Sequence, residues 1–187
     1  WPHLVEEKKR GLKAMIFADV RGFGALNEAQ VPLFIDEVLT PLARCVQQQG
    51  HHVKHQNTWG DGLFLVLDSV DAAAEVALAL QACFREIDLK GVGLPEFLAL
   101  RIGGHYGPVH ETDDPIMGAS GVFGTEVSLA ARIEPVTVPG SIYVSEPFAC
   151  SLAANTEGLY RCEQVDTIAP RRGKADMPLF SLRKLKK

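Results

Sequence analysis

The order of its apolar segments constrains the fold of this chain more than any other feature of the sequence. Residues 13–20 (KAMIFADV) form a short apolar run bounded by glycines, which is typical of a buried strand. Two extended stretches, 52–59 and 63–68, flank Gly60-Asp61-Gly62, and this arrangement predicts a β-hairpin. Residues 98–109 alternate like a strand, and we expect a fourth strand there.

Helical patterns separate these strands. Asn27 and Gln30 have the spacing of a capping box, and they open a predicted helix that ends at Gly50. A second helix is predicted from Ser69. The apolar faces of the two helices contain Val31, Phe34, Ile35, Val38, Leu42 and Val46, and then Val70, Ala73, Ala74, Ala77, Leu80 and Phe84. The remaining sequence predicts a short helix over 124–135, a strand over 141–145, a small helix near 146–154 and a closing strand over 177–184.

The resulting order is strand, helix, strand, strand, helix, strand, followed by further elements. This is the split βαβ pattern of an α+β, ferredoxin-like fold, with a βαββαβ core and C-terminal additions. We expect a mostly antiparallel central sheet with helices packed on it. Residues 1–12 are mostly polar and are interpreted as a linker or boundary, and residues 13–187 as one domain.

The composition excludes several classes of function. A formal net charge of −4 gives no electrostatic reason to expect nucleic-acid binding. No apolar run approaches the length that spans a membrane. The four cysteines are far apart in the sequence and form no CxxC pair, so they are interpreted as buried thiols of a reducing compartment. We therefore expect a cytoplasmic domain.

Two carboxylates are expected to meet at one edge of the sheet. Asp19 ends the first strand and Asp61 lies at the tip of the hairpin, and the predicted topology places these strands side by side. Two carboxylates near a core repel each other unless a cation compensates them. Their oxygen ligands suit Mg²⁺ or Mn²⁺, and two such ions can bind a triphosphate and activate an attacking hydroxyl.

The segment DVRGFG, residues 19–24, adds a turn suited to phosphate. Its glycines let backbone amides turn toward a ligand, and a helix is expected just beyond. Amides in a tight turn next to a helix N-terminus form an anion-binding site. A structural turn is the alternative interpretation, so the prediction depends on this turn and the two aspartates lying together.

The motifs IFADVRGFGAL, NTWGDGLFLVLDS, LRIGGHYGPV, FGTEVSLAARIE and PGSIYVSE occur in this order. In sequence and spacing they resemble the catalytic domain of the class III nucleotidyl cyclases, the adenylate/guanylate cyclases. The resemblance covers about residues 13–182 and is strongest to bacterial domains attached to tetratricopeptide-repeat proteins. It implies a head-to-tail homodimer with active sites shared across the interface, and it allows an attached regulatory or repeat domain outside this sequence.

The resemblance also implies roles for individual residues. Asp19 and Asp61 would bind two metal ions, with the carbonyl of Val20 as a further ligand. Arg132, supplied by the partner subunit, would stabilise charge on the phosphates. The phosphate-binding residues would be Arg21, Gly22, Phe23, Gly24 and Lys174, with Arg172 as an alternative to Lys174.

Three positions depart from the family pattern. Ser128 stands four residues before Arg132, where the family usually has asparagine, and its shorter side chain is expected to orient the ribose less well. Asn57 and Gly121 (or Ser120, if the loop shifts) fall where adenylate cyclases have lysine and aspartate, and guanylate cyclases glutamate and cysteine. These positions prescribe no nucleobase.

The function that this sequence favours is metal-dependent cyclisation of a nucleoside triphosphate to a 3′,5′-cyclic nucleotide and pyrophosphate. Two alternatives stay open. One is a degenerate cyclase-like domain that binds nucleotide without turnover, and the other is a domain that only dimerises. The hairpin WGDG lacks the glycine-glycine-acidic-acidic signature of a diguanylate cyclase, which sets that activity aside.

Overall fold

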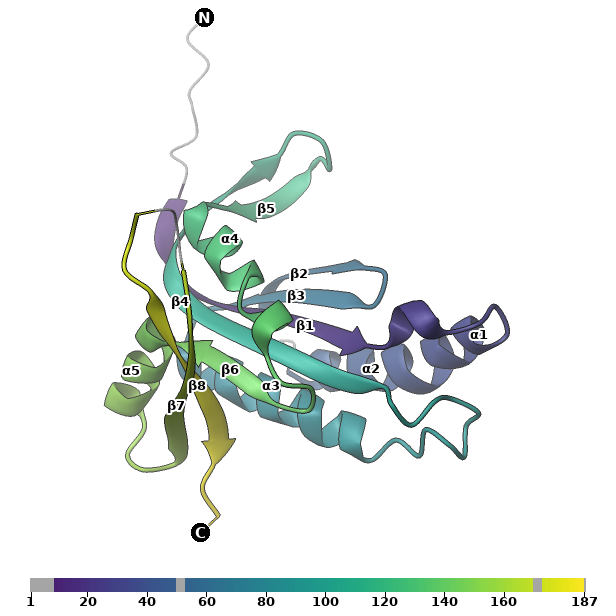
Figure 1. Cartoon of the computed structure of the whole chain (residues 1–187). Helices are drawn as coiled ribbons and strands as arrows, with labels where there is room; N and C mark the ends of the chain where they lie inside the picture. Colours follow the sequence, from purple (N-terminus) through teal and green to yellow (C-terminus); the bar gives the residue numbers. More distant parts are fainter. Residues whose placement is uncertain (1–8, 50–52, 170–172, 187) are drawn as a thin grey trace, which may run out of the picture.

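A computed structural model describes residues 9–49, 53–169 and 173–186 of the chain. Within them the expected α+β fold is confirmed, as one mixed sheet with helices packed on it (Figure 1). The strands are β1 (Lys9–Arg21), β2 (Val53–Trp59), β3 (Gly62–Leu67), β4 (Ala99–Asp114), β5 (Ala119–Phe123), β6 (Ile142–Ser145), β7 (Tyr160–Ile168) and β8 (Met177–Lys184). The α-helices are α1 (Gln30–Phe34), α2 (Thr40–Gln48), α3 (Val70–Arg85), α4 (Thr125–Ala131) and α5 (Glu146–Asn155). Short helical segments are η1 (Phe23–Ala25), η2 (Ile35–Leu39) and η3 (Glu134–Val136).

The strand order is β2-β3-β1-β4-β6-β8-β7, with β5 paired to β4 off this path. Its first four strands form the expected ferredoxin-like core, because β1 lies between β3 and β4 and is antiparallel to both. The pairing of β4 with β6 is parallel, which makes the sheet mixed. Asp19 faces Arg101 across the β1–β4 pair, and Ala18 faces Leu63 across the β1–β3 pair.

The two faces of the sheet have different coverings. Helices α2, α3 and α5 cover one face and α4 with η3 the other (Figure 1). Side chains alternate across a strand, so Ile16 and Ala18 of β1 join the core under the first group of helices, whereas Met15 and Phe17 pack toward α4. Asp19 follows the second set and lies on the α4 face. The larger hydrophobic core thus lies on one face of the sheet, and the side chain of Asp19 lies on the opposite face.

Several elements differ from the sequence expectation. Strand β1 begins at Lys9, so residues 9–12, which were expected in a linker, pair with β4. Strands β5 and β7 were not expected. The expected helix end at Gly50 lies outside the described residues. The interpretation of the cysteines as buried thiols was wrong, because Cys150 is exposed and Cys45, Cys83 and Cys162 are only half-buried.

The long helical segment after the glycine turn contains a π turn at Ile35–Leu39. Its buried residues, Phe34, Val38, Leu42 and Val46, are spaced by four. In a continuous α-helix each four-residue step drifts by about 40° around the axis. A wider π turn reduces this drift and keeps the four side chains on one face. The hydroxyl of Thr40 donates to the carbonyl of Ile35 at 2.9 Å, which satisfies an acceptor at this turn.

Candidate active site

The centre of the candidate site is the meeting of Asp19 and Asp61. Asp19 lies near the end of β1, and Asp61 lies in the turn between β2 and β3, where Gly60 has a positive φ of 61°. A two-residue turn with a left-handed glycine is a normal way to close a hairpin. Because β3 pairs with β1, the turn brings the two carboxyl groups next to each other, close enough for Asp19 to raise the pKa of Asp61. The structure therefore brings together these two sequence-predicted residues.

The electrostatics of this pair are unusual for carboxylates. Burial, together with the adjacent Asp19, raises the pKa of Asp61 to about 7. Backbone amides of Asp61 and Val20 oppose the shift by donating to its carboxylate. The metal-free protein thus disfavours a negative charge on Asp61 near neutral pH, in conflict with the ionised form that a metal ion requires. A bound cation would remove this conflict.

The donor set fits a divalent ion of the Mg²⁺ or Mn²⁺ type. Both side chains supply hard oxygen ligands, and the backbone of Val20 lies beside them. No group of three or more His, Cys, Asp or Glu side chains forms a metal cluster in the part of the chain that the structure describes. Two carboxylates without a third acidic, imidazole or thiol side chain match ions that complete their coordination with water and substrate phosphates. These residues fit the expected cofactor.

Arg101 and Glu134, which the sequence analysis missed, lie beside the pair. Nη2 of Arg101 is 3.5 Å from Oδ2 of Asp19, and its Nε is 2.9 Å from Oε1 of Glu134, although these last two atoms are not aligned as a hydrogen bond. Burial raises the pKa of the Glu134 carboxyl, and Arg101 opposes this shift. Arg101 could have been recognised from the sequence, because it is a charged residue between Leu100 and Ile102 in an otherwise apolar strand. Arg101 thus provides a fixed positive charge next to Asp19.

The glycine turn after β1 is tightly packed at its first glycine and open at its second. Gly22 has a φ of 95°, and a Cβ there would lie 2.6 Å from Cε2 of Phe97, so only glycine fits without rearrangement. A Cβ on Gly24 would meet no atom within 4 Å, so its surroundings are open. Phe23 packs against Phe34 at a ring distance of 4.9 Å, and Arg21 is exposed. The expected helix start just beyond is the three-residue η1, and α1 begins only at Gln30.

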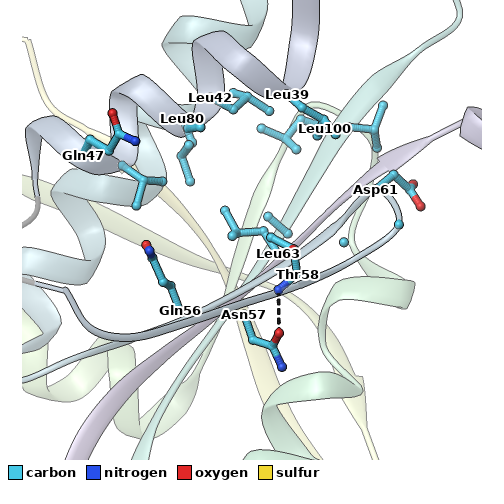
Figure 2. Close-up of a pocket in the computed structure, with 16 residues that line it drawn as sticks. Leu39, Leu42, Gln47, Gln56, Asn57, Thr58, Asp61, Leu63, Leu80 and Leu100 are labelled. Carbon is cyan, nitrogen blue, oxygen red and sulfur yellow. Dashed lines mark hydrogen bonds between the residues drawn. The ribbon is translucent and has the colours of Figure 1, made fainter. Parts of the chain in front are cut away.

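A pocket of about 390 Å³ lies between α2 and the back of the β2–β3 hairpin. Figure 2 shows that its leucines and Gln56 point into it, whereas the amide of Asn57 points away and the carboxylate of Asp61 turns from the leucines at its edge. The polar groups of the candidate site are thus on the other side of the hairpin. Oδ1 of Asn57 accepts from the amide of Thr58 at 2.8 Å, which leaves the NH₂ group of Asn57 to donate to a ligand.

The remaining predicted residues lie on other elements. Ser128 and Arg132 are both exposed, on α4 and at its C-terminal cap. Gly121 lies on β5, in a ribbon that projects away from the β2–β3 hairpin in Figure 1. Lys174 is exposed in the loop before β8, a strand that lies across the sheet from the β2–β3 hairpin, and Arg172 lies outside the described residues. One chain therefore does not assemble the complete predicted set.

The comparisons with known proteins agree with this arrangement of elements. Residues 5–184 match the family described as the adenylate and guanylate cyclase catalytic domain. This chain belongs to that family.

Named relatives include cyclases of both base specificities. Guanylate cyclase 2G of Mus musculus is 29% identical over 186 residues, which cover 90% of this chain but 16% of the relative. A putative adenylate cyclase 3 of Rhizobium meliloti (strain 1021) is 31% identical over 75% of this chain and 23% of the relative. The solved adenylyl cyclase CyaB from P. aeruginosa shares the fold, with a TM-score of 0.84 at 18% identity over 97% of this chain and 98% of that one. The cyclase domain described here thus spans a small part of these curated relatives.

None of the helices in the described ranges is long and apolar enough to cross a bilayer.

Proposed function

We propose that this cyclase domain converts a nucleoside triphosphate to a 3′,5′-cyclic nucleotide and pyrophosphate as a homodimer, in the cytoplasm, as a source of a signalling nucleotide. The single observation that carries the proposal is the contact between Asp19 and Asp61 beside Arg101. Two adjacent carboxyl groups, one of them with a raised pKa, next to a fixed guanidinium and a glycine turn, suit a metal-bound triphosphate better than a purely structural role.

In the proposed reaction the ribose 3′-hydroxyl attacks the α-phosphorus, the bond from that phosphorus to the bridging oxygen breaks, and pyrophosphate leaves. Two Mg²⁺ or Mn²⁺ ions, when bound by Asp19, Asp61 and the carbonyl of Val20, would supply charge neutralisation and lower the pKa of the attacking hydroxyl. The amides of Gly22, Phe23 and Gly24, with the side chain of Arg21, would bind the phosphates. Arg101 would add positive charge beside Asp19. Catalysis then depends on position and charge, without a protein nucleophile.

The proposed dimer explains why one chain lacks a complete site. Ser128 and Arg132 lie on the exposed side of α4, and a second copy arranged head-to-tail would bring them to the first copy's aspartates. Lys174 would contact the terminal phosphates, and Asn57 and Gly121 would border the base. The ribbon that carries β5 offers apolar surface to such a partner, since Ile116 and Met117 at its tip are 92% and 73% exposed.

The activity is tested by incubating the purified domain with Mn²⁺ and separately with ATP, GTP, CTP and UTP, with products identified by mass spectrometry. We expect one or more cyclic products that require the metal. This experiment also identifies the base, which Asn57 and Gly121 leave open. Metal-dependent triphosphate binding without any cyclic product would instead support the alternative of a nucleotide-binding domain without turnover.

Metal binding is expected to depend on pH through Asp61. Its pKa of about 7 in the folded, metal-free protein means that an ion must displace a proton below that pH. Affinity for Mn²⁺ should therefore rise about tenfold per pH unit up to about pH 7 and level off above it. The stability of the metal-free protein should change in the opposite direction. Because Asp61 has a raised pKa, it binds its proton more tightly in the folded than in the unfolded protein. The free energy of unfolding therefore falls as pH rises from about 4 to 7.

Calorimetric titration with Mn²⁺ at a series of pH values measures this dependence, and thermal unfolding in a chelator measures the second effect. The variant Asp68→Asn is the control, because Asp68 is exposed at the opposite end of β3 from Asp61 and pairs with Lys13 and Lys54. It should keep the pH profile. An Mn²⁺ affinity that does not change across this pH range would contradict the assignment of Asp61 as a ligand.

A further inference from the structure

A row of three polar side chains, two of them fully buried, connects α4 to the sheet. His105 of β4 is 1% exposed, and its Nε2 lies 2.5 Å from Oε2 of Glu126 on α4. Its Nδ1 lies 2.6 Å from Oγ of Ser145, which is fully buried at the end of β6. The row therefore runs from the first turn of α4 across β4 and β6, on the α4 face of the sheet, to the N-cap of α5. We refer to Glu126, His105 and Ser145 as the relay.

The hydrogen bonds of the relay are consistent with one protonation state. Burial lowers the pKa of His105, and Glu126 opposes that shift. In the neutral imidazole with a proton on Nε2, the ring donates to Glu126 and accepts from the hydroxyl of Ser145. Oγ of Ser145 can then still accept from the amide of Phe148, 3.4 Å away, as the cap of α5. Every group has a partner in this arrangement, as buried polar groups require.

The order carboxylate, imidazole, hydroxyl also occurs in hydrolytic triads. Here the hydroxyl has no access to a substrate, because Ser145 is 0% exposed and caps a helix. The relay is therefore a structural connection. Any effect that it has on function must act through α4, at its exposed end.

Helix α4 has few contacts of its own that would hold it in place. It has seven residues, Thr125–Ala131, and a helix this short is marginal without tertiary contacts. Its N-cap is Gly124, which has no side chain to cap it, and Ala130 is its one fully buried residue. The side chain of Glu126 packs against Gly107. A Cβ at that position would lie 2.9 Å from Oε2 of Glu126, so a larger residue would displace the carboxylate.

We propose that the relay is a positioning device that holds α4 on the sheet, and that Glu126 and His105 thereby place Ser128 and Arg132 for the reaction. The part of this proposal that concerns the reaction rests on the proposed function. Glu126 stands two residues before Ser128 and six before Arg132, so a shift of the first turn moves both. Small displacements of groups that act on a transition state reduce the rate more than they reduce substrate binding.

The test compares Glu126→Ala with Glu126→Gln. The amide oxygen of glutamine can still accept from Nε2 of His105, whereas alanine leaves the imidazole without a partner. We expect Glu126→Ala to lower kcat about tenfold or more, with KM for the nucleotide changed less than about twofold. Glu126→Gln should recover most of kcat. Amide hydrogen exchange in residues 125–132 should become faster in Glu126→Ala and return toward the wild-type rate in Glu126→Gln.

Glu111→Ala is the matched control, because Glu111 lies on the same strand as His105, is as exposed as Glu126, and pairs with Lys13 and His55 outside the relay. It should change neither kcat nor exchange in α4. The proposal is overturned if Glu126→Ala leaves α4 exchange unchanged, or if Glu111→Ala has the same effects. If the wild-type domain forms no cyclic product, the proposed function fails, and hydrogen exchange still decides whether the relay holds α4.

Discussion

Asp61→Asn is expected to lose cyclase activity by about a hundredfold to a thousandfold while the domain stays folded. Asparagine keeps the size of the side chain but removes the charge that the metal requires. Because burial and Asp19 make an ionised Asp61 unfavourable in the metal-free protein, the variant should unfold at the same or a higher temperature than the wild type at about pH 8. Cyclic product by mass spectrometry and thermal unfolding in a chelator measure the two effects.

The loss should be specific to this carboxylate. Asp68→Asn makes the same chemical change at the other end of β3, where Asp68 pairs with Lys13 and Lys54, and should retain full activity. An active Asp61→Asn variant, or an equal loss in Asp68→Asn, would show that the aspartate pair does not bind the catalytic metal.

Arg132→Ala is expected to lower kcat by about a hundredfold, with metal binding unchanged, because the arginine would act on the phosphates of the site whose metal the other subunit binds. Arg85→Ala is the control, since Arg85 is also exposed in the last turn of a helix, at the end of α3. It should leave kcat as it is.

Mixing the two inactive variants tests whether the sites are shared. In a heterodimer of Asp61→Asn and Arg132→Ala, one of the two composite sites contains both intact residues, and the other contains neither. If subunits exchange freely, an equal mixture should recover about a quarter of the wild-type activity. A mixture as inactive as its components, with subunit exchange demonstrated separately, would contradict the head-to-tail arrangement.

The core of the fold could be predicted because its signals are local. Ser69 caps α3 and accepts from the amide of Ala72, and Asn27 and Gln30 bond each other's backbone amides as a capping box does. Strand β8 has the bounds that its sequence predicted, Met177–Lys184. The contact of Asp19 with Asp61 followed from topology, once the hairpin was placed beside the first strand.

Other features depend on contacts that no local pattern contains. Residues separated by four look the same in sequence whether the turn between them is α or π, so the Ile35–Leu39 turn was missed. Strand β5 lies in a projecting ribbon and contributes no fully buried residue, and it therefore lacks the apolar pattern of a core strand. Arg101 lies next to Glu134 because η3 packs directly against Gly103 of β4. A Cβ on Gly103 would lie 2.7 Å from the amide nitrogen of Glu134. The functional roles of the site residues remain predictions for the experiments above.

The alternation of β1 has a consequence for how this domain can change over generations. Ala14, Ile16, Ala18 and Val20 form part of the main core, and Asp19 lies between the last two on the opposite face. Inserting or deleting one residue upstream of Asp19 would exchange the two sets, turning a carboxylate into the core. A change of length within β1 should therefore disturb the core and the candidate site together, whereas a substitution on one face of the strand can leave the other face intact.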